Sequence, residues 1–191
     1  MKSVPTLGTP TIGKRTYIDA SAKIIGNVTI GEGVFVAPNA TLRADEPGSQ
    51  IIVHKGCNIQ DNVVVHALRG SVVSIGEGTS VAHGAIVHGP CSIGERCFVG
   101  FGAVVFRSVL GDESVVQHRA VVTDAEVPSK KVVDVGAIID GKKEVPELPA
   151  VSGEMRQFVD GVRQTNSELV CTYRKAGMPS LESFCSEGGK D

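Results

Sequence analysis

The chain has 191 residues, of which 41% are hydrophobic and 4% aromatic, and it contains 23 glycines and no tryptophan. A net charge of -2 leaves no basic surface of the kind that binds a nucleic acid. No apolar run is long enough to span a membrane, and the first residues lack an apolar signal core. We therefore expect a soluble, cytoplasmic protein with a thin aliphatic core and no nucleic-acid or membrane partner.

Large aliphatic residues recur every six positions through most of the chain. They are Ile12, Ile18, Ile24, Ile30, Val36, Leu42, Val53, Ile59, Val65, Ile75, Val81, Val87, Ile93, Val99, Val105, Leu110, Val116 and Val122. A period of six fits neither a helix nor a half-exposed strand. It is typical of a parallel β-solenoid, in which three short strands make a coil of about 18 residues.

Two further positions of the repeat agree with a solenoid. Small side chains follow most aliphatic residues four positions later, as expected for a narrow interior. Cys57, Cys91 and Cys97 fall in this position, so we expect them to fill the core, and five scattered cysteines do not suggest a disulfide framework. Glycine often follows the aliphatic residue directly, which predicts a sharp corner or a positive φ there.

The repeat fades after Val122, and a connector covers residues 127–152. Apolar residues then fall on one stripe of a helix over residues 153–176, and we expect this helix to pack along the solenoid. The predicted layout is a hexapeptide-repeat β-helix domain with its connector at 1–152, a C-terminal α-helix at 153–176 and a flexible tail at 177–191. Cys171 and Cys185 lie outside the repeat.

Three histidines interrupt the repeat. His66 and His88 each follow their aliphatic residue directly, and one full coil separates them if residues 67–74 contain a loop. Neighbouring strands are about 4.8 Å apart, so both imidazoles would reach one metal ion. His83 falls on a different edge, too far away to join them. A third ligand from His83 therefore requires a second chain, and a closed homotrimer would supply three shared sites.

Other polar residues occupy the corners near these histidines. Gln60 and Asp61 fall on the edge of His83, one coil earlier, and Arg43 falls on the edge of His66. Arg43 could pair with Asp61 of a neighbouring chain in a bidentate ion pair. The alternative for the charged residues is a structural salt bridge or a loop cap.

His54 and His118 are also corner residues of the repeat. Taken singly, each is interpreted as a solvated side chain. His118 falls on the edge of His83 but two coils further along, too far to bind the same ion.

Five segments resemble those of the γ-class carbonic anhydrases, a class that includes the N-terminal domain of the carboxysomal scaffold protein. They read RADE (43–46), NIQD (58–61), VVHAL (64–68), VAHGAIVHGP (81–90) and GERCFVGFGAVVF (94–106). The resemblance spans residues 10–175 and implies a left-handed β-helix, although the general rule for parallel crossovers favours the right-handed form. It also implies a trimeric enzyme in which a metal-bound hydroxide hydrates carbon dioxide reversibly to bicarbonate at sites shared between subunits.

The resemblance assigns a role to each matching residue. It makes the three histidines, His66, His83 and His88, the ligands of one divalent metal ion per subunit. Gln60 and Asn166 would contact the hydroxide, the substrate or bicarbonate, and Glu46 is a candidate proton relay. Arg43, Asp45, Asn58 and Asp61 would form the polar surroundings of the site and its interface. Asn166 also lies in the apolar stripe of the predicted helix, which points it inward, where it would need a partner.

The ligand set determines the expected chemistry. Three neutral imidazoles leave one position for a water molecule, whose pKa falls toward about 7. Zn²⁺ is the default ion, and Fe²⁺ or Co²⁺ also suit imidazole. One departure from the best-known members is the segment after the first metal histidine, where residues 67–74 read ALRGSVVS and carry no acidic proton shuttle. The chain resembles a short-loop subclass in this respect.

Two other functions use the same solenoid. A hexapeptide-repeat acyltransferase binds an acyl carrier such as coenzyme A between subunits, and it usually needs one catalytic histidine and no metal. A non-catalytic subunit for bicarbonate binding or assembly would keep the trimer but show no turnover.

Overall fold

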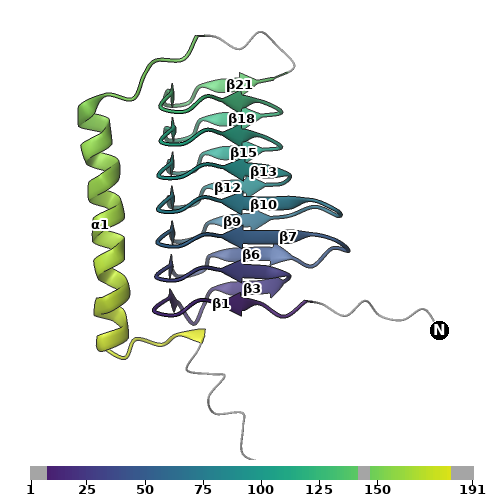
Figure 1. Cartoon of the computed structure of the whole chain (residues 1–191), viewed down its shortest axis with the longest axis vertical. Helices are drawn as coiled ribbons and strands as arrows, with labels where there is room; N and C mark the ends of the chain where they lie inside the picture. The colour runs from purple at the N-terminus through teal and green to yellow at the C-terminus, as the bar shows by residue number, and fades with distance from the viewer. Residues whose placement is uncertain (1–7, 142–146, 182–191) are drawn as a thin grey trace, which may run out of the picture.

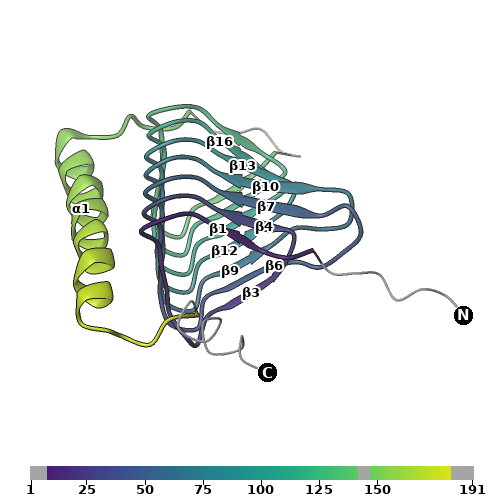
Figure 2. The same cartoon turned by 60° about the horizontal axis from the view of Figure 1, so that its bottom comes forward.

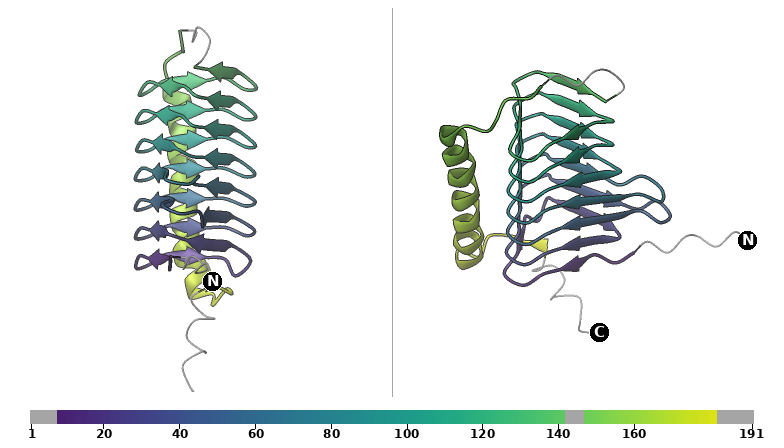
Figure 3. Two further views of the ribbon diagram at one scale, coloured as in Figure 1. Left: turned by 90° about the vertical axis from the view of Figure 1, so that its right-hand side faces the viewer. Right: turned by 45° about the horizontal axis from the view of Figure 1, so that its top comes forward.

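The structure, a computed structural model, describes residues 8–141 and 147–181. These residues form a left-handed parallel β-helix with a single long helix beside it (Figure 1). Each coil contributes one strand to each of three parallel, seven-stranded sheets, and the coils stack along one axis (Figure 3). The predicted solenoid of hexapeptide repeats with a helix packed along it is therefore confirmed.

The strands of the three sheets alternate along the chain. The first sheet contains β1 (Thr11–Ile12), β4 (Val28–Ile30), β7 (Gln50–Val53), β10 (Val72–Ile75), β13 (Cys91–Ile93), β16 (Val109–Leu110) and β19 (Glu126–Val127). The second contains β2 (Tyr17–Ile18), β5 (Phe35–Val36), β8 (Asn58–Ile59), β11 (Ser80–Val81), β14 (Phe98–Val99), β17 (Val115–Val116) and β20 (Val132–Val133). The third contains β3 (Lys23–Gly26), β6 (Thr41–Ala44), β9 (Val64–His66), β12 (Ile86–His88), β15 (Val104–Phe106), β18 (Val121–Thr123) and β21 (Ile138–Asp140).

The interior is filled by the aliphatic and small residues of the repeat. Ile59, Val81 and Val99 are aligned on neighbouring strands, and all three are fully buried. Cys57 and Cys97 lie in the same interior, as expected from their position in the repeat. Burial raises the pKa of the Cys57 thiol to about 12, which keeps it protonated and unreactive.

The glycine that follows an aliphatic residue is required by the spacing of the coils. A Cβ atom on Gly76 would lie 2.5 Å from the carbonyl carbon of Gly94 in the next coil, so no side chain fits there. The positive φ expected at this position occurs two residues later instead, for example at Gly78, where φ is 67°. The sequence pattern thus predicted the corner correctly. It assigned close packing between coils and a positive φ to the same glycine, whereas the structure divides them between two positions.

Helix α1 (Gly153–Lys175) runs the height of the solenoid along the second sheet (Figures 1 and 3). Ser152 caps its first turn by accepting a hydrogen bond from the Met155 N–H at 3.1 Å. Val159 and Val170 are its buried residues, and they pack against separate apolar clusters on the upper and lower coils. Among the described residues no helix is long and apolar enough to cross a membrane.

The segments flanking α1 attach it to both ends of the solenoid. Before the helix, the Pro149 carbonyl accepts a hydrogen bond from the Val132 N–H at 2.9 Å. After it, Ser180 pairs with Asp19 in an antiparallel bridge, and the Tyr17 hydroxyl donates to the Pro179 carbonyl at 3.0 Å. Residues 182–191, which include Cys185 and most of the tail expected to be flexible, lie outside the described residues.

Candidate metal centre

His66 and His88 occupy equivalent positions on the neighbouring strands β9 and β12 of the third sheet. Their rings are 4.8 Å apart between centroids, and Nδ1 of His66 lies 3.0 Å from Nε2 of His88. This is the histidine pair that the repeat predicts. It lies at the corner between the third and first sheets, where two coils extend outward on the side away from α1 (Figures 1 and 2).

The pair fits a divalent cation. Two nitrogens bound to one tetrahedral Zn²⁺ at about 2.0–2.1 Å lie about 3.3 Å apart, close to the observed separation. Burial, and then the positive charge of Arg43, lower the pKa of His66, which favours the neutral imidazole that binds metal. The remaining ring nitrogens, Nε2 of His66 and Nδ1 of His88, are buried without a hydrogen-bond partner.

Three charged residues surround this pair. Arg43 aligns with His66 on the adjacent strand, and its Nη1 lies 3.4 Å from Oδ2 of Asp45. Oε1 of Glu46 lies 3.3 Å from Nε2 of His66, close enough for charge attraction but not aligned as a hydrogen bond. The other Glu46 oxygen accepts a hydrogen bond from the Arg69 N–H at 2.8 Å. The loop at 45–49 therefore places a carboxylate beside His66, although the loop after His66 has none.

His83 lies at the opposite end of β12, at the corner between the second and third sheets. Its Nδ1 is 2.9 Å from Oδ2 of Asp61, one coil earlier, as the repeat indicates. The five residue steps from His83 to His88 lead from one corner of the solenoid, along β12, to the next corner. His83 therefore cannot share an ion with the histidine pair of its own chain. Within the described part of one chain, no three His, Cys, Asp or Glu side chains are grouped to hold a metal ion.

Gln60 is held by a buried chain of hydrogen bonds. Its Nε2 donates to Oδ1 of Asn58 at 2.9 Å, and Nδ2 of Asn58 donates to the Ser80 hydroxyl at 2.6 Å. One N–H group of the Gln60 amide is thus bonded to Asn58, whereas its acceptor Oε1 is buried without a partner. Sequence reasoning missed Ser80. The sequence could have indicated Ser80, because the repeat aligns it with Asn58 one coil away, at a position that is apolar in the other coils.

A cavity of about 500 Å³ separates α1 from the His83 corner. Gln60 and His83 line it from the solenoid, and Asn166 lines it from the helix. Asn166 Nδ2 donates to the Val162 carbonyl at 2.9 Å, so its donor is satisfied within the helix. We call this space the His83 cavity. The predicted site residues therefore form two groups, one at this cavity and one at the histidine pair.

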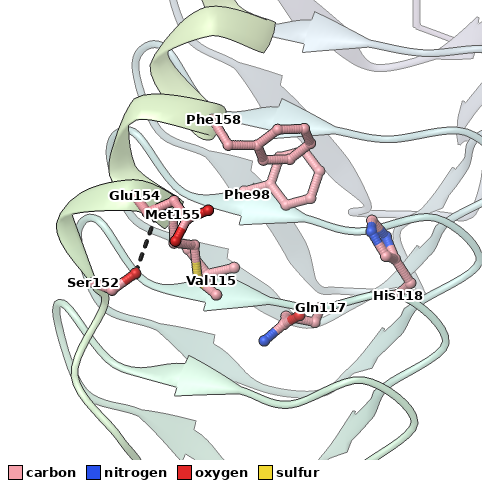
Figure 4. Close-up of a pocket in the computed structure, with 8 residues that line it drawn as sticks. All are labelled: Phe98, Val115, Gln117, His118, Ser152, Glu154, Met155 and Phe158. Atoms are coloured by element: carbon pink, nitrogen blue, oxygen red, sulfur yellow. Dashed lines mark hydrogen bonds between the residues drawn. The ribbon is translucent and has the colours of Figure 1, made fainter.

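A second cavity, of about 330 Å³, lies beside the first under the start of α1 (Figure 4). Phe158 lines both cavities, and His118 forms part of the wall of the second. His118 stacks on Phe101 at 4.3 Å, and its Nδ1 accepts the Phe101 N–H at 3.0 Å. It is therefore a packed residue and not the freely solvated side chain that the sequence suggested.

The unpartnered polar atoms coincide with the predicted site. Among the described residues, four buried side-chain nitrogen or oxygen atoms lack a hydrogen-bond partner: Asp45 Oδ1, Gln60 Oε1, His66 Nε2 and His88 Nδ1. Buried polar groups are normally satisfied, so such atoms indicate a missing ligand, ion or partner. Both groups of site residues contain such atoms.

An apolar stripe connects the two groups on the outer face of the third sheet. Val64 and Ile86 are neighbours on β9 and β12 and expose 38% and 39% of their surfaces. Val104, Val121 and Ile138 continue the same ladder on later coils. Exposed apolar ladders of this kind are typical of protein interfaces.

Comparisons with known proteins agree with the fold and show the family. The family model for the bacterial transferase hexapeptide (six repeats) matches residues 9–44 and 73–107. The carbonic anhydrase of Methanosarcina thermophila is 34% identical over 169 residues, which cover 78% of this chain and 68% of that protein. The chain therefore belongs to the γ-class carbonic anhydrase family.

Two other similar proteins carry different descriptions. The carboxysome assembly protein CcmM of Nostoc sp. is 36% identical over 85% of this chain, but the chain spans only 31% of the length of that protein. A Bacillus cereus protein described as an acetyltransferase superimposes with a TM-score of 0.77, over 88% of this chain and 94% of that one, at 20% identity. At this identity the likeness shows a shared fold and no more.

Proposed function

We propose that the chain is a metal-dependent carbonic anhydrase whose site forms between two copies. His66 and His88 of one copy and His83 of the next would bind one divalent cation, with Zn²⁺ as the default and Fe²⁺ or Co²⁺ as alternatives. The observation that carries the proposal is the histidine pair, because Nδ1 of His66 and Nε2 of His88 lie 3.0 Å apart on neighbouring strands, a separation that suits two ligands of one cation. The 34% identity to an archaeal carbonic anhydrase supports the choice of reaction.

The residues present suit this reaction. A cation held by three neutral imidazoles lowers the pKa of a water molecule, which supplies a nucleophile for carbon dioxide near neutral pH. Gln60 Oε1 would accept a hydrogen bond from the attacking oxygen or from bicarbonate, because its amide donor is already held by Asn58. Asn166 would contact the same ligand from α1. Glu46 would receive the proton that each turnover releases.

A homotrimer with one metal per chain would join the two groups of residues. Within one chain the two groups lie at opposite ends of the third sheet, so a second copy would supply the missing ligand. The exposed stripe at Val64 and Ile86 lies between the groups and offers an apolar contact surface. A closed ring repeats the same contact three times and leaves no stripe unpaired.

Complementation between inactive variants tests this assignment. A His66→Ala chain still supplies His83, and a His83→Ala chain still supplies His66 and His88, so mixed trimers contain intact sites. We expect metal binding and carbon dioxide hydration to return after subunit exchange, measured on the same anaerobic sample. The matched control mixes His66→Ala with His88→Ala, which damage the same half of the site and should restore nothing. No recovery after confirmed exchange would show that the sites are not shared in this way.

The similarity to the carboxysome assembly protein favours one alternative, a non-catalytic bicarbonate-binding or assembly subunit. Such a subunit could form the same trimer and bind the metal, so metal content alone does not distinguish it. A sample with one metal per chain and no hydration above the rate in buffer would establish the alternative. The acyltransferase alternative predicts instead that coenzyme A binds between subunits, which calorimetry would detect.

A further inference from the structure

Two polar residues interrupt an apolar column beneath α1. The outward-facing strand positions of the second sheet that α1 covers are Tyr17, Phe35, Asn58, Ser80, Phe98, Val115 and Val132. All are at most 4% exposed. Asn58 and Ser80 lie side by side on the neighbouring strands β8 and β11. Asn58 is the member of this column with a side-chain amide, and Ser80 is the member with an aliphatic hydroxyl.

Stability alone does not explain this polar pair. A buried hydrogen bond contributes little net stability, because the same groups bond to water in the unfolded chain. Apolar side chains of similar size would fill the same space without any group to satisfy. The contact that an apolar pair could not provide is the one with Gln60, which Asn58 holds at 2.9 Å.

The hydrogen bonds of this group have a direction. Gln60 donates to Asn58, and Asn58 donates to the Ser80 hydroxyl at 2.6 Å. If only the side-chain amide of Gln60 turned over, its carbonyl oxygen would face the carbonyl oxygen of Asn58. The side-chain amides of Gln60 and Asn58 can therefore turn over only together. In the observed direction Gln60 presents an acceptor, Oε1, on the wall of the His83 cavity.

In the observed direction the Ser80 hydroxyl accepts the Asn58 N–H group, and the same hydroxyl could donate to the carbonyl of a reversed Asn58, so Ser80 matters because it keeps the observed direction free of an unpaired N–H. Without it, the observed direction would leave a buried N–H group of Asn58 without an acceptor. The reversed direction would leave a buried carbonyl oxygen unpaired, which proteins tolerate more readily than an orphaned N–H. Removing the hydroxyl should therefore reverse both amides and turn the Gln60 NH₂ group toward the cavity.

We propose that Ser80 is a positioning residue that makes the site select ligands carrying an O–H donor. Gln60 Oε1 can hydrogen-bond to bicarbonate through its O–H group, whereas it faces an anion such as nitrate with an acceptor only. The two anions share one charge and a planar three-oxygen shape, so the O–H group is the relevant difference. The choice of ligand rests on the proposed function, whereas the direction of the amides does not.

Anion selectivity of the cobalt-loaded trimer tests the proposal. The visible spectrum of Co²⁺ reports anion binding directly, and the dissociation constants for bicarbonate and nitrate give a selectivity ratio. We expect Ser80→Ala to shift this ratio toward nitrate by about tenfold, the effect of one hydrogen bond. Ser80→Thr keeps the hydroxyl and should keep the ratio. Ser114→Ala removes another fully buried serine and should also leave the ratio unchanged.

A measurement on metal-free protein separates this proposal from the proposed function. In protein with ¹⁵N-labelled glutamine, the Gln60 side-chain amide is identified by its loss in Gln60→Glu. The proton that is held by Asn58 should exchange slowly in the wild type and at least tenfold faster in Ser80→Ala. If Ser80→Ala does not fold, Ser80→Cys fills the same space with a weak acceptor and should show the same change to a smaller degree.

The outcomes are distinguishable. Unchanged exchange in the Ser80 variants would overturn the positioning role, whether or not the protein binds a metal. Faster exchange with an unchanged anion ratio would overturn the selectivity. Loss of cobalt binding in the wild type would contradict the proposed function, while the exchange experiment would still decide the role of Ser80.

Discussion

Asp61 holds His83 in place: Oδ2 of Asp61 lies 2.9 Å from Nδ1 of His83, although the His83 side chain is 55% exposed. The carboxylate lies beside Nδ1 and thereby leaves Nε2 as the nitrogen available to a ligand. The repeat suggested that Asp61 would pair with Arg43 of a neighbouring chain. Within one chain, Arg43 contacts Asp45 and Asp61 contacts His83, so both carboxylates already have a partner in the single chain.

We expect Asp61→Asn to weaken metal binding. The amide is a poorer acceptor and can turn a donor toward His83, so the ring loses its fixed orientation and some of its basicity. Loss of such a supporting carboxylate typically reduces metal affinity by about 10- to 100-fold. Competition with a chelator would measure the change. Asp160→Asn, on the exposed face of α1, is the matched control, and equal affinities of the two variants would contradict the role of Asp61.

The stripe on the third sheet gives a prediction about assembly. Ile86→Glu places a charge on a side chain that is 39% exposed in the single chain, so the fold itself should tolerate it. Buried in an interface between copies, the same charge would be strongly unfavourable. We expect sedimentation to show a smaller species that has lost most of its metal. Val109→Glu, equally exposed but on the first sheet, should remain assembled.

Much of the fold could be predicted from the sequence because the solenoid is periodic. Ile59, Val81 and Val99 align because each strand repeats the last, and the corner of each histidine follows from counting repeats. Left-handedness did not follow from periodicity, because a six-residue pattern reads the same for either hand. It came from the resemblance to a family.

Sequence reasoning predicted only those parts of the site whose positions the repeat determines. The repeat places His66 beside His88, and Asp61 beside His83. It says nothing about how α1 docks, so the meeting of Asn166 with Gln60 at one cavity depended on the resemblance. Ser80 was missed because an outward-facing strand position can be polar where nothing covers it, and the repeat does not show that α1 covers this one. Its importance depends on the direction of a hydrogen bond that no sequence pattern records.

The raised pKa of Tyr17 leads to a prediction about the free energy of unfolding at high pH. Burial, with a smaller contribution from the charge of Asp19, raises the pKa of Tyr17 from 10.0 to about 12. The unfolded chain therefore loses this proton at lower pH than the folded chain. The stability that Tyr17 contributes is present below pH 10 and is lost as the pH rises from 10 to about 12.

We expect the Tyr17→Phe substitution to reduce the loss of stability at high pH. Near pH 8 the variant should be about 1 kcal/mol less stable, because the hydroxyl no longer donates to Asp19 and Pro179. Between pH 10 and 12 its free energy of unfolding should fall less steeply than that of the wild type, as urea denaturation would show. Tyr173→Phe, in the same aromatic cluster, should keep most of the alkaline loss. Parallel curves for wild type and Tyr17→Phe would refute the assignment.

Glu46 is the carboxylate placed to carry protons away from the site. Its Oε1 lies 3.3 Å from His66, and its side chain is 35% exposed, so it contacts both the buried pair and solvent. A positioned acid or base typically speeds proton transfer by about a hundredfold or more. Because the loop after His66 has no carboxylate, Glu46 and the buffer should share this step.

We therefore expect Glu46→Gln to lower the turnover number while the ratio of turnover to KM for carbon dioxide hydration stays nearly constant. The amide keeps an oxygen that can accept the Arg69 N–H, so the loop should keep its shape while its proton acceptor is removed. Imidazole should restore much of the lost turnover, because a soluble base can replace the missing one. Glu77→Gln, on an exposed corner next to Lys55, is the matched control and should behave like the wild type at every imidazole concentration. Turnover that responds neither to imidazole nor to the Glu46 substitution would mean that protons leave by another route.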